Sequence, residues 1–215
     1  MRPIVLLAGL LAAAPAHAAR HELSYEFLGA FTSDLTLGEV FDTRLPAFGL
    51  KAGGAVLRNG PRTRRFGLVI DGGWSRASRG SRVDLYSEVF DRNTPFGATL
   101  VVDTITLGAK ADVSVADLFF PYIHVQAALL HGRVLTDSDP DDHDDPFVDD
   151  GLAPAGLFTF GFELGPPDTH LGWPVTFAFY LEAGVQIAGG MTVGALGGPV
   201  DLSGAVLRSG VGLRF

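Results

Sequence analysis

The sequence predicts an all-β protein, an eight-stranded antiparallel up-and-down β-barrel that crosses a membrane. Three observations lead to this prediction. Apolar and polar residues alternate with a period of two in many segments, which is typical of strands with two different faces. Along the chain, short connections between these strands alternate with connections that are mostly longer. Hydrophobic residues make up 47% of the chain and charged residues only 19%, with 28 glycines and a mean hydropathy of +0.27, so a large apolar surface must be covered.

The first element in order is a secretory signal peptide at residues 1–18. Arg2 is followed by an apolar stretch from Ile4 to Ala14 and by the small-x-small sequence Ala16-His17-Ala18, which is typical of a cleavage site. The apolar stretch is too short for a membrane-spanning helix, so a retained anchor is the less favoured alternative. We therefore expect cleavage after Ala18 and a barrel at residues 19–215.

The barrel strands come next, and their connections differ at its two ends. Connections 59–64, 114–120 and 165–172 are short, whereas 76–97, 136–151 and 188–204 are longer and more polar or glycine-rich. Short periplasmic turns and long extracellular loops are typical of transmembrane barrels. The eight strands are expected at residues 21–31, 45–58, 65–75, 98–113, 121–135, 154–164, 173–187 and 203–215.

The two faces of the strands indicate which side meets lipid. One face of strand 173–187 is bulky and apolar throughout, while the other carries small residues and an isolated charge, Glu182. A soluble barrel of the lipocalin kind has the same alternation, but we expect its outer face to be rich in Lys, Glu and Thr. The mixed face instead fits the inside of a narrow barrel. The aromatic residues Tyr25, Phe66, Trp74 and Trp173 lie near strand ends and are expected at the membrane interfaces.

Together with the final Val211, Leu213 and Phe215, these features resemble the small outer-membrane barrels of the OmpA/OmpX type. The resemblance implies location in the outer membrane of a diderm bacterium, among outer-membrane lipids and lipopolysaccharide. It also implies that these three residues are recognised by the barrel-assembly machinery. The net charge of −8, which loss of Arg2 would make −9, argues against nucleic acid as a partner, and no cofactor is expected.

A charge network is expected inside the barrel. Eight strands enclose a lumen that side chains can fill, so we expect a plug of paired charges, with a narrow ion channel as the alternative. Arg208 is expected to pair with Glu26 or Glu182 on its flanking strands. The members of the expected network are Glu26, Lys51, Asp71, Lys110, Asp112, Glu163, Glu182 and Arg208.

Two long connections carry clustered charges. In TDSDPDDHDDPFVDD, Asp137, Asp139 and Asp141 repeat the first ligands of a calcium loop, but the later positions of that motif do not match. A solvated acidic loop is favoured, with weak calcium binding as the alternative. Arg76, Arg79 and Arg82 in the connection 76–97 are interpreted as ordinary exposed arginines, with contact to lipid phosphates as the alternative.

An enzymatic role is the least favoured function. Some barrels of this size modify lipid A, which requires a nucleophile, a histidine and an orienting acid close together. His131 lies at the outer end of its strand on the lipid-facing side, but His131-Gly132-Arg133 has no serine two residues on, and His124 faces inward as a hydrogen-bonded filler. We therefore predict a non-enzymatic barrel with a structural or surface-loop binding role, with a passive channel as the first alternative and a lipid A-modifying enzyme as the second.

Overall fold

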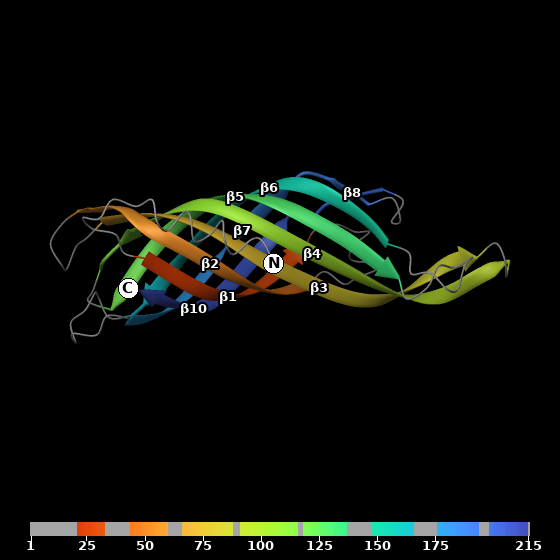
Figure 1. The fold of residues 1–215 in the computed structure, drawn as a ribbon, viewed down its shortest axis with the longest axis horizontal. Coiled ribbons are helices and arrows are strands. Elements are labelled where there is room, and N and C mark those ends of the chain that lie inside the picture. Colours follow the sequence, from red (N-terminus) through yellow and green to blue (C-terminus); the bar gives the residue numbers. More distant parts are fainter. Residues whose placement is uncertain are drawn as a thin grey trace.

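The strands form a closed antiparallel barrel in the order β1-β10-β7-β6-β5-β4-β3-β2, in which β1 pairs with both β2 and β10 (Figure 1). This confirms the predicted fold class. The computed structural model describes residues 21–32, 44–59, 66–87, 91–115, 118–136, 148–165, 176–193 and 198–214. The barrel strands are β1 (His21–Thr32), β2 (Arg44–Asn59), β3 (Phe66–Ser87), β4 (Arg92–Val113), β5 (Phe119–Thr136), β6 (Val148–Leu164), β7 (Thr176–Ala188) and β10 (Gly204–Arg214).

The alternation of faces is confirmed where side chains are described. On β7, Phe177 and Phe179 are 59% and 61% exposed, while Ala178 and Tyr180 between them are buried. On β3, Phe66 and Trp74 lie on the outward face, opposite the buried Asp71. The residues on the outer wall are therefore those that the alternation in the sequence places on the apolar face. The side chain of Tyr25 and all of Trp173 lie outside the described residues, and no helix in the described ranges is long and apolar enough to cross a membrane.

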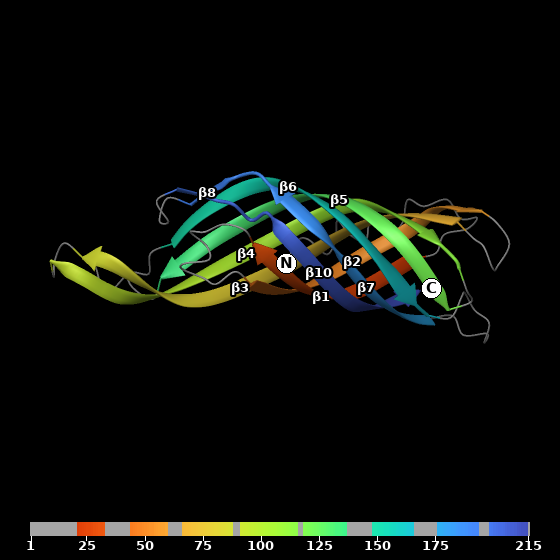
Figure 2. The same cartoon turned by 180° about the vertical axis from the view of Figure 1, so that it is seen from behind.

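The prediction of a loop at residues 76–97 was wrong, because β3 and β4 continue as one hairpin. Their register is unbroken from Phe66↔Val113 to Ser87↔Arg92. Beyond Ala77, β3 pairs with β4 alone, and we call residues 78–97 the arm. The arm projects well past the rest of the barrel (Figures 1 and 2). The charged residues at 76–97 predicted a loop, but a strand pair can also carry them, because β2 does not pair with this part of β3.

The turn of the arm includes the one positive-φ residue besides glycine in the described part of the chain. Asp91 has φ of 47°, in the left-handed region that Asp tolerates better than most residues. The two strands of the arm are paired from Ser87↔Arg92 inward.

The connection 188–204 also contains strands that were not predicted. β8 (Met191–Val193) and β9 (Gly198–Val200) form a separate two-stranded sheet. This small hairpin lies at the same end of the barrel as the arm, whereas the end of β10 lies at the opposite end (Figure 2). We call the two ends the arm end and the turn end. Connections between β2 and β3, β4 and β5, and β6 and β7 all lie at the turn end.

Candidate functional site

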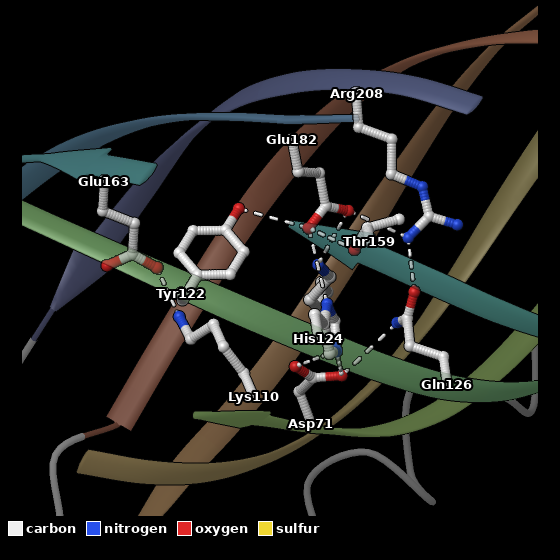
Figure 3. A network of polar contacts seen from close by, with 10 residues as sticks. Asp71, Lys110, Tyr122, His124, Gln126, Thr159, Glu163, Glu182 and Arg208 are labelled. Carbon is white, nitrogen blue, oxygen red and sulfur yellow. Dashed lines mark hydrogen bonds and ion pairs between the residues drawn. The ribbon is translucent and has the colours of Figure 1, made fainter. Parts of the chain in front are cut away.

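Two layers of side chains fill the lumen. The polar layer crosses the lumen (Figure 3), and Lys110 and Glu163 lie near the ends of β4 and β6 at the turn end. It comprises Lys51, Asp71, Lys110, Asp112, Tyr122, His124, Gln126, Thr159, Glu163, Tyr180, Glu182 and Arg208. The apolar layer lies toward the arm end and comprises Leu45, Ala47, Ala77, Ala98, Leu100, Val102, Leu130, Val134, Ala153, Met191, Val200, Leu202 and Val206.

Glu182 on β7 is the centre of the polar layer. Its Oε2 accepts hydrogen bonds from the Tyr122 hydroxyl at 3.2 Å and the Thr159 hydroxyl at 3.3 Å. Its Oε1 accepts one from Arg208 Nη1 at 3.1 Å, and Lys51 Nζ lies 4.0 Å from the same oxygen. The side chain of Glu182 is fully buried, so these donors replace the water that a carboxylate requires.

His124 links two carboxylates across the lumen. Its Nε2 lies 3.0 Å from Asp71 Oδ2, and its Nδ1 lies 3.5 Å from Glu182 Oε2. Because a neutral imidazole carries one N–H, only the doubly protonated ring donates to both carboxylates. Asp71 belongs to β3, His124 to β5 and Glu182 to β7, so this row ties together three walls of the barrel (Figure 3).

Two further pairs extend the polar layer. Gln126 accepts a hydrogen bond from Arg208 Nη1 and donates one to Asp71 Oδ1 at 3.5 Å. Lys110 on β4 pairs with Glu163 on β6. Counting the whole layer, four carboxylates face three basic side chains and His124, so the described charges in the lumen approximately balance.

Glycine on the inward face makes room for this network. A Cβ added to Gly108 on β4 would lie 2.8 Å from His124 Nε2 and 2.6 Å from Gln126 Cγ. Either contact is too close for two heavy atoms that are not bonded, so His124 and Gln126 can occupy the centre of the lumen only while Gly108 remains small. The small residues of the inward face thus determine which large ones fit.

The structure brings together most of the charged residues that the sequence placed inside. Arg208 contacts Glu182, one of its two expected partners, while the side chain of the other, Glu26, is not described. Of the expected network, Lys51, Asp71, Lys110, Asp112 and Glu163 also line the lumen. Tyr122, Gln126 and Thr159 were missed as members. In the sequence, only their position on the inward face marks them, and this does not distinguish them from other uncharged polar residues on the same face.

The remaining site residues lie on the outer wall or outside the residues that the structure describes. Val211 and Leu213 lie on the outward face of β10, and Phe215 is not described. The candidate calcium ligands Asp137, Asp139 and Asp141 also lie outside the described residues. Within the described ranges, no group of three or more His, Cys, Asp or Glu is arranged to hold a metal ion.

The small β8–β9 hairpin closes the apolar layer at the arm end. Met191 and Val200 are fully buried, and a Cβ on Gly132 would overlap the end of the Met191 side chain. Ala188 N donates to Ser203 Oγ at 2.9 Å, which holds the base of the connection to the end of β7. Both layers therefore lie in series between the turn end and the arm end.

His131 is on the outward face, as its position in the strand predicts. Its Nε2 lies 3.1 Å from Asp150 Oδ2 on β6. In the part of the chain that the structure describes, no serine is hydrogen-bonded to this pair. The pair alone supplies a base and an orienting acid but no nucleophile.

Several solved structures are similar to the chain over most of its length. Ail of Yersinia pestis, solved in complex with the heparin analogue sucrose octasulfate, has 15% sequence identity and a TM-score of 0.43, over 92% of this chain and 97% of that chain. Neisserial surface protein A has 11% identity and a TM-score of 0.44, over 91% and 95% of the two chains. The transport unit of the autotransporter AIDA-I from Escherichia coli has 10% identity and a TM-score of 0.42, over 97% and 96%.

Neither a protein-family model nor a curated protein sequence matches the chain.

Proposed function

We propose that the protein is a non-enzymatic outer-membrane barrel with a closed lumen, whose role is to hold the arm and the neighbouring loops at the cell surface. The observation that carries this proposal is the filling of the lumen by two layers in series, one polar and one apolar. A solute that crossed the barrel would have to displace both. A passive channel would need a continuous polar path, and the apolar layer interrupts it.

Membrane insertion is supported by the outer wall. On β4, the apolar outward residues end toward the turn end at Val113 and toward the arm end at Ile105, next to Asp103. The eight residue steps from Ile105 to Val113 span about 26 Å along the strand, or about 20 Å along the barrel axis at a tilt of about 40°. That height approaches the apolar band of about 25 Å that flanking aromatic residues border in an outer-membrane barrel.

The short connections at the turn end support a periplasmic location for that end. The arm then lies outside the cell, and lipids and lipopolysaccharide of the outer membrane surround its base. Assembly by the barrel-assembly machinery, with cleavage of a signal peptide at residues 1–18, completes the proposal.

The orientation can be tested by cysteine labelling, because the chain contains no cysteine. Ser81→Cys lies on the arm, and Val115→Cys lies in a connection at the turn end, where Val115 is 62% exposed. A membrane-impermeant maleimide added to intact cells is expected to label the first variant, and to label the second only after lysis. The reverse pattern, or equal labelling of both, would contradict the proposed orientation.

The closed lumen can be tested in planar bilayers containing the purified, heat-modifiable protein. No steady single-channel openings are expected. Steady openings would instead support the channel.

The absence of enzymatic activity can be tested by incubating the protein with lipid A, with His131→Ala as the matched control. We expect neither protein to release acyl chains. A release that depends on His131 would refute the non-enzymatic role.

A further inference from the structure

Charged side chains lie side by side on the outward face at the arm end of β3, β4 and β5. Arg76 donates from Nε and Nη2 to the two oxygens of Asp103, at 2.8 and 2.9 Å. Arg133 Nη2 donates to Asp103 Oδ2 at 3.1 Å. One carboxylate on β4 thus holds a guanidinium group on each side. We call Arg76, Asp103 and Arg133 the arginine clamp.

The clamp lies at the edge of the apolar band. Trp74, two residues from Arg76, faces outward, and its ring centroid is 5.6 Å from Arg76 Cζ. Ile105 and Leu129, two and four residues from Asp103 and Arg133 toward the turn end, are 60% and 47% exposed. These apolar side chains belong to the wall that we place in lipid. The clamp therefore lies at the depth of the lipid headgroups.

The outer surface of the clamp is cationic. The Arg76 and Arg133 side chains are 41% and 35% exposed, whereas that of Asp103 is only 15% exposed and lies behind them. Asp150 is the strand partner of Arg133, but its carboxylate contacts His131 instead. Arg133 donates to Asp103 from Nη2 alone, so its contact with Asp103 occupies only one of its guanidinium nitrogens. Two guanidinium groups share one carboxylate, which leaves donors for another anion.

The clamp is local to one side of the barrel. At the arm end of β7 and β10, the outward residues are Ile187, which is 71% exposed, and Ala205. A general polar girdle would place charges there as well. The charges on β3, β4 and β5 therefore form a site on one wall.

We propose that the arginine clamp binds the phosphate group of a lipid headgroup in the outer leaflet. Guanidinium groups bind phosphate oxygens through paired N–H donors, and Asp103 fixes both groups in advance, which reduces the entropy lost on binding. The clamp faces away from the barrel at the height of the headgroups, so the anion that meets it is a lipid phosphate. This proposal rests on the proposed function, because it requires the barrel to lie in a bilayer.

Trp74 provides a reporter for the bound lipid. The chain has two tryptophans, so Trp173→Phe leaves Trp74 as the only one. The protein is reconstituted in phosphatidylcholine vesicles that contain either brominated phosphatidic acid or brominated phosphatidylcholine, since bromine quenches a tryptophan that it touches. We expect phosphatidic acid to bind beside Trp74 about five-fold more strongly than phosphatidylcholine.

Substitutions in the clamp should remove this preference. In Arg76→Gln/Asp103→Asn/Arg133→Gln, which leaves no unpaired carboxylate, the ratio is expected to fall to about one. Arg76→Gln alone keeps Arg133 on Asp103 and is expected to give an intermediate ratio. Arg82→Gln removes the same charge from the arm, outside the clamp, and is expected to keep the full preference.

Each contrary outcome overturns a stated part of the proposal. A preference that survives the triple substitution, or one that Arg82→Gln removes equally, refutes the site. Loss of the preference on addition of inorganic phosphate alone would mean that the clamp binds a free anion. Quenching by both lipids to the same extent refutes the lipid phosphate site but leaves the membrane barrel intact. No quenching of Trp74 by either lipid would refute membrane insertion itself.

Discussion

The polar and apolar layers fill the same lumen by different physical means. In the polar layer, Glu182 accepts hydrogen bonds from three donors at defined distances and contacts His124, and each of these side chains comes from a particular strand. In the apolar layer, Leu100 and Leu130 are buried among aliphatic side chains, whose contacts have no required direction. The polar layer should therefore tolerate few substitutions, whereas the apolar layer should accept those that preserve volume.

The two layers also contribute differently to the stability and the specificity of the fold. Burying a paired charge costs desolvation free energy that its partners largely offset, so the polar layer adds little net stability but penalises wrong pairings. Burying aliphatic side chains is favourable in itself, at about 25 cal/mol per Å² of apolar surface. A shift in the register of the strands would separate the pairs of the polar layer, so this layer disfavours wrong registers, whereas the apolar layer contributes to the stability of the arm end.

The largest expected effect is that of Arg208→Leu. The change leaves the buried carboxylate of Glu182 without its hydrogen bond from Arg208, and we expect a loss of about 3–5 kcal/mol in the free energy of unfolding. The measurement is the urea midpoint of the folded barrel in detergent micelles, followed by its heat-modifiable migration. Arg82→Leu on the exposed arm is the matched control and is expected to change stability by less than about 0.5 kcal/mol.

A second substitution sharpens this test. Arg208→Leu/Glu182→Leu removes both charges, so the double variant is expected to be more stable than the sum of the two single changes predicts. If the two effects simply add, the pair does not interact in the folded barrel and the polar layer is not a coupled network.

The sequence predicted the barrel and much of the lumen for a common physical reason. Period-two alternation depends only on which face a residue occupies, so the inward positions of Asp71, Lys110 and Arg208 followed directly from counting along each strand. The pairing of Arg208 with Glu182 followed because they belong to neighbouring strands. Register across the barrel could not be predicted this way. The contact of His124 with both Asp71 and Glu182 joins strands that are not neighbours.

The arm and the small β8–β9 hairpin were missed for another reason. Prediction of a strand from alternation requires a sustained apolar face, and the sequence of the arm beyond Ala77 has no such face over its whole length. The arginine clamp was missed likewise, because Arg76 was assigned to a loop and Asp103 and Arg133 were not grouped with it. Their outward parity was visible in the sequence, but only the register of β3, β4 and β5 places their side chains together.

The apolar layer should respond to volume instead of charge. Leu100→Ala is expected to cost about 2–4 kcal/mol, because Leu100 is fully buried and its removal leaves a cavity. Leu100→Met preserves the volume and should cost less than about 1.5 kcal/mol. Leu107→Ala on the outward face of the same strand is the control, with an expected cost below about 1 kcal/mol. Equal losses for Leu100→Ala and Leu107→Ala in the urea midpoint would show that Leu100 is not in a packed core.

The smallest expected effects come from two glycines under the β8–β9 hairpin. A Cβ on Gly151 would overlap the backbone carbonyl of Thr192, whereas one on Gly132 meets only the flexible end of Met191. A backbone atom can move only with the whole hairpin, but the end of a methionine can change rotamer.

Gly151→Ala is therefore expected to cost about 1–3 kcal/mol and Gly132→Ala less than about 1 kcal/mol. Met191→Ala should abolish the cost of Gly132→Ala while leaving most of that of Gly151→Ala, measured as urea midpoints in a double-mutant cycle. If Gly132→Ala proves the more costly of the two, the hairpin does not pack over β5 and β6 in this way, and the apolar layer is open at the arm end.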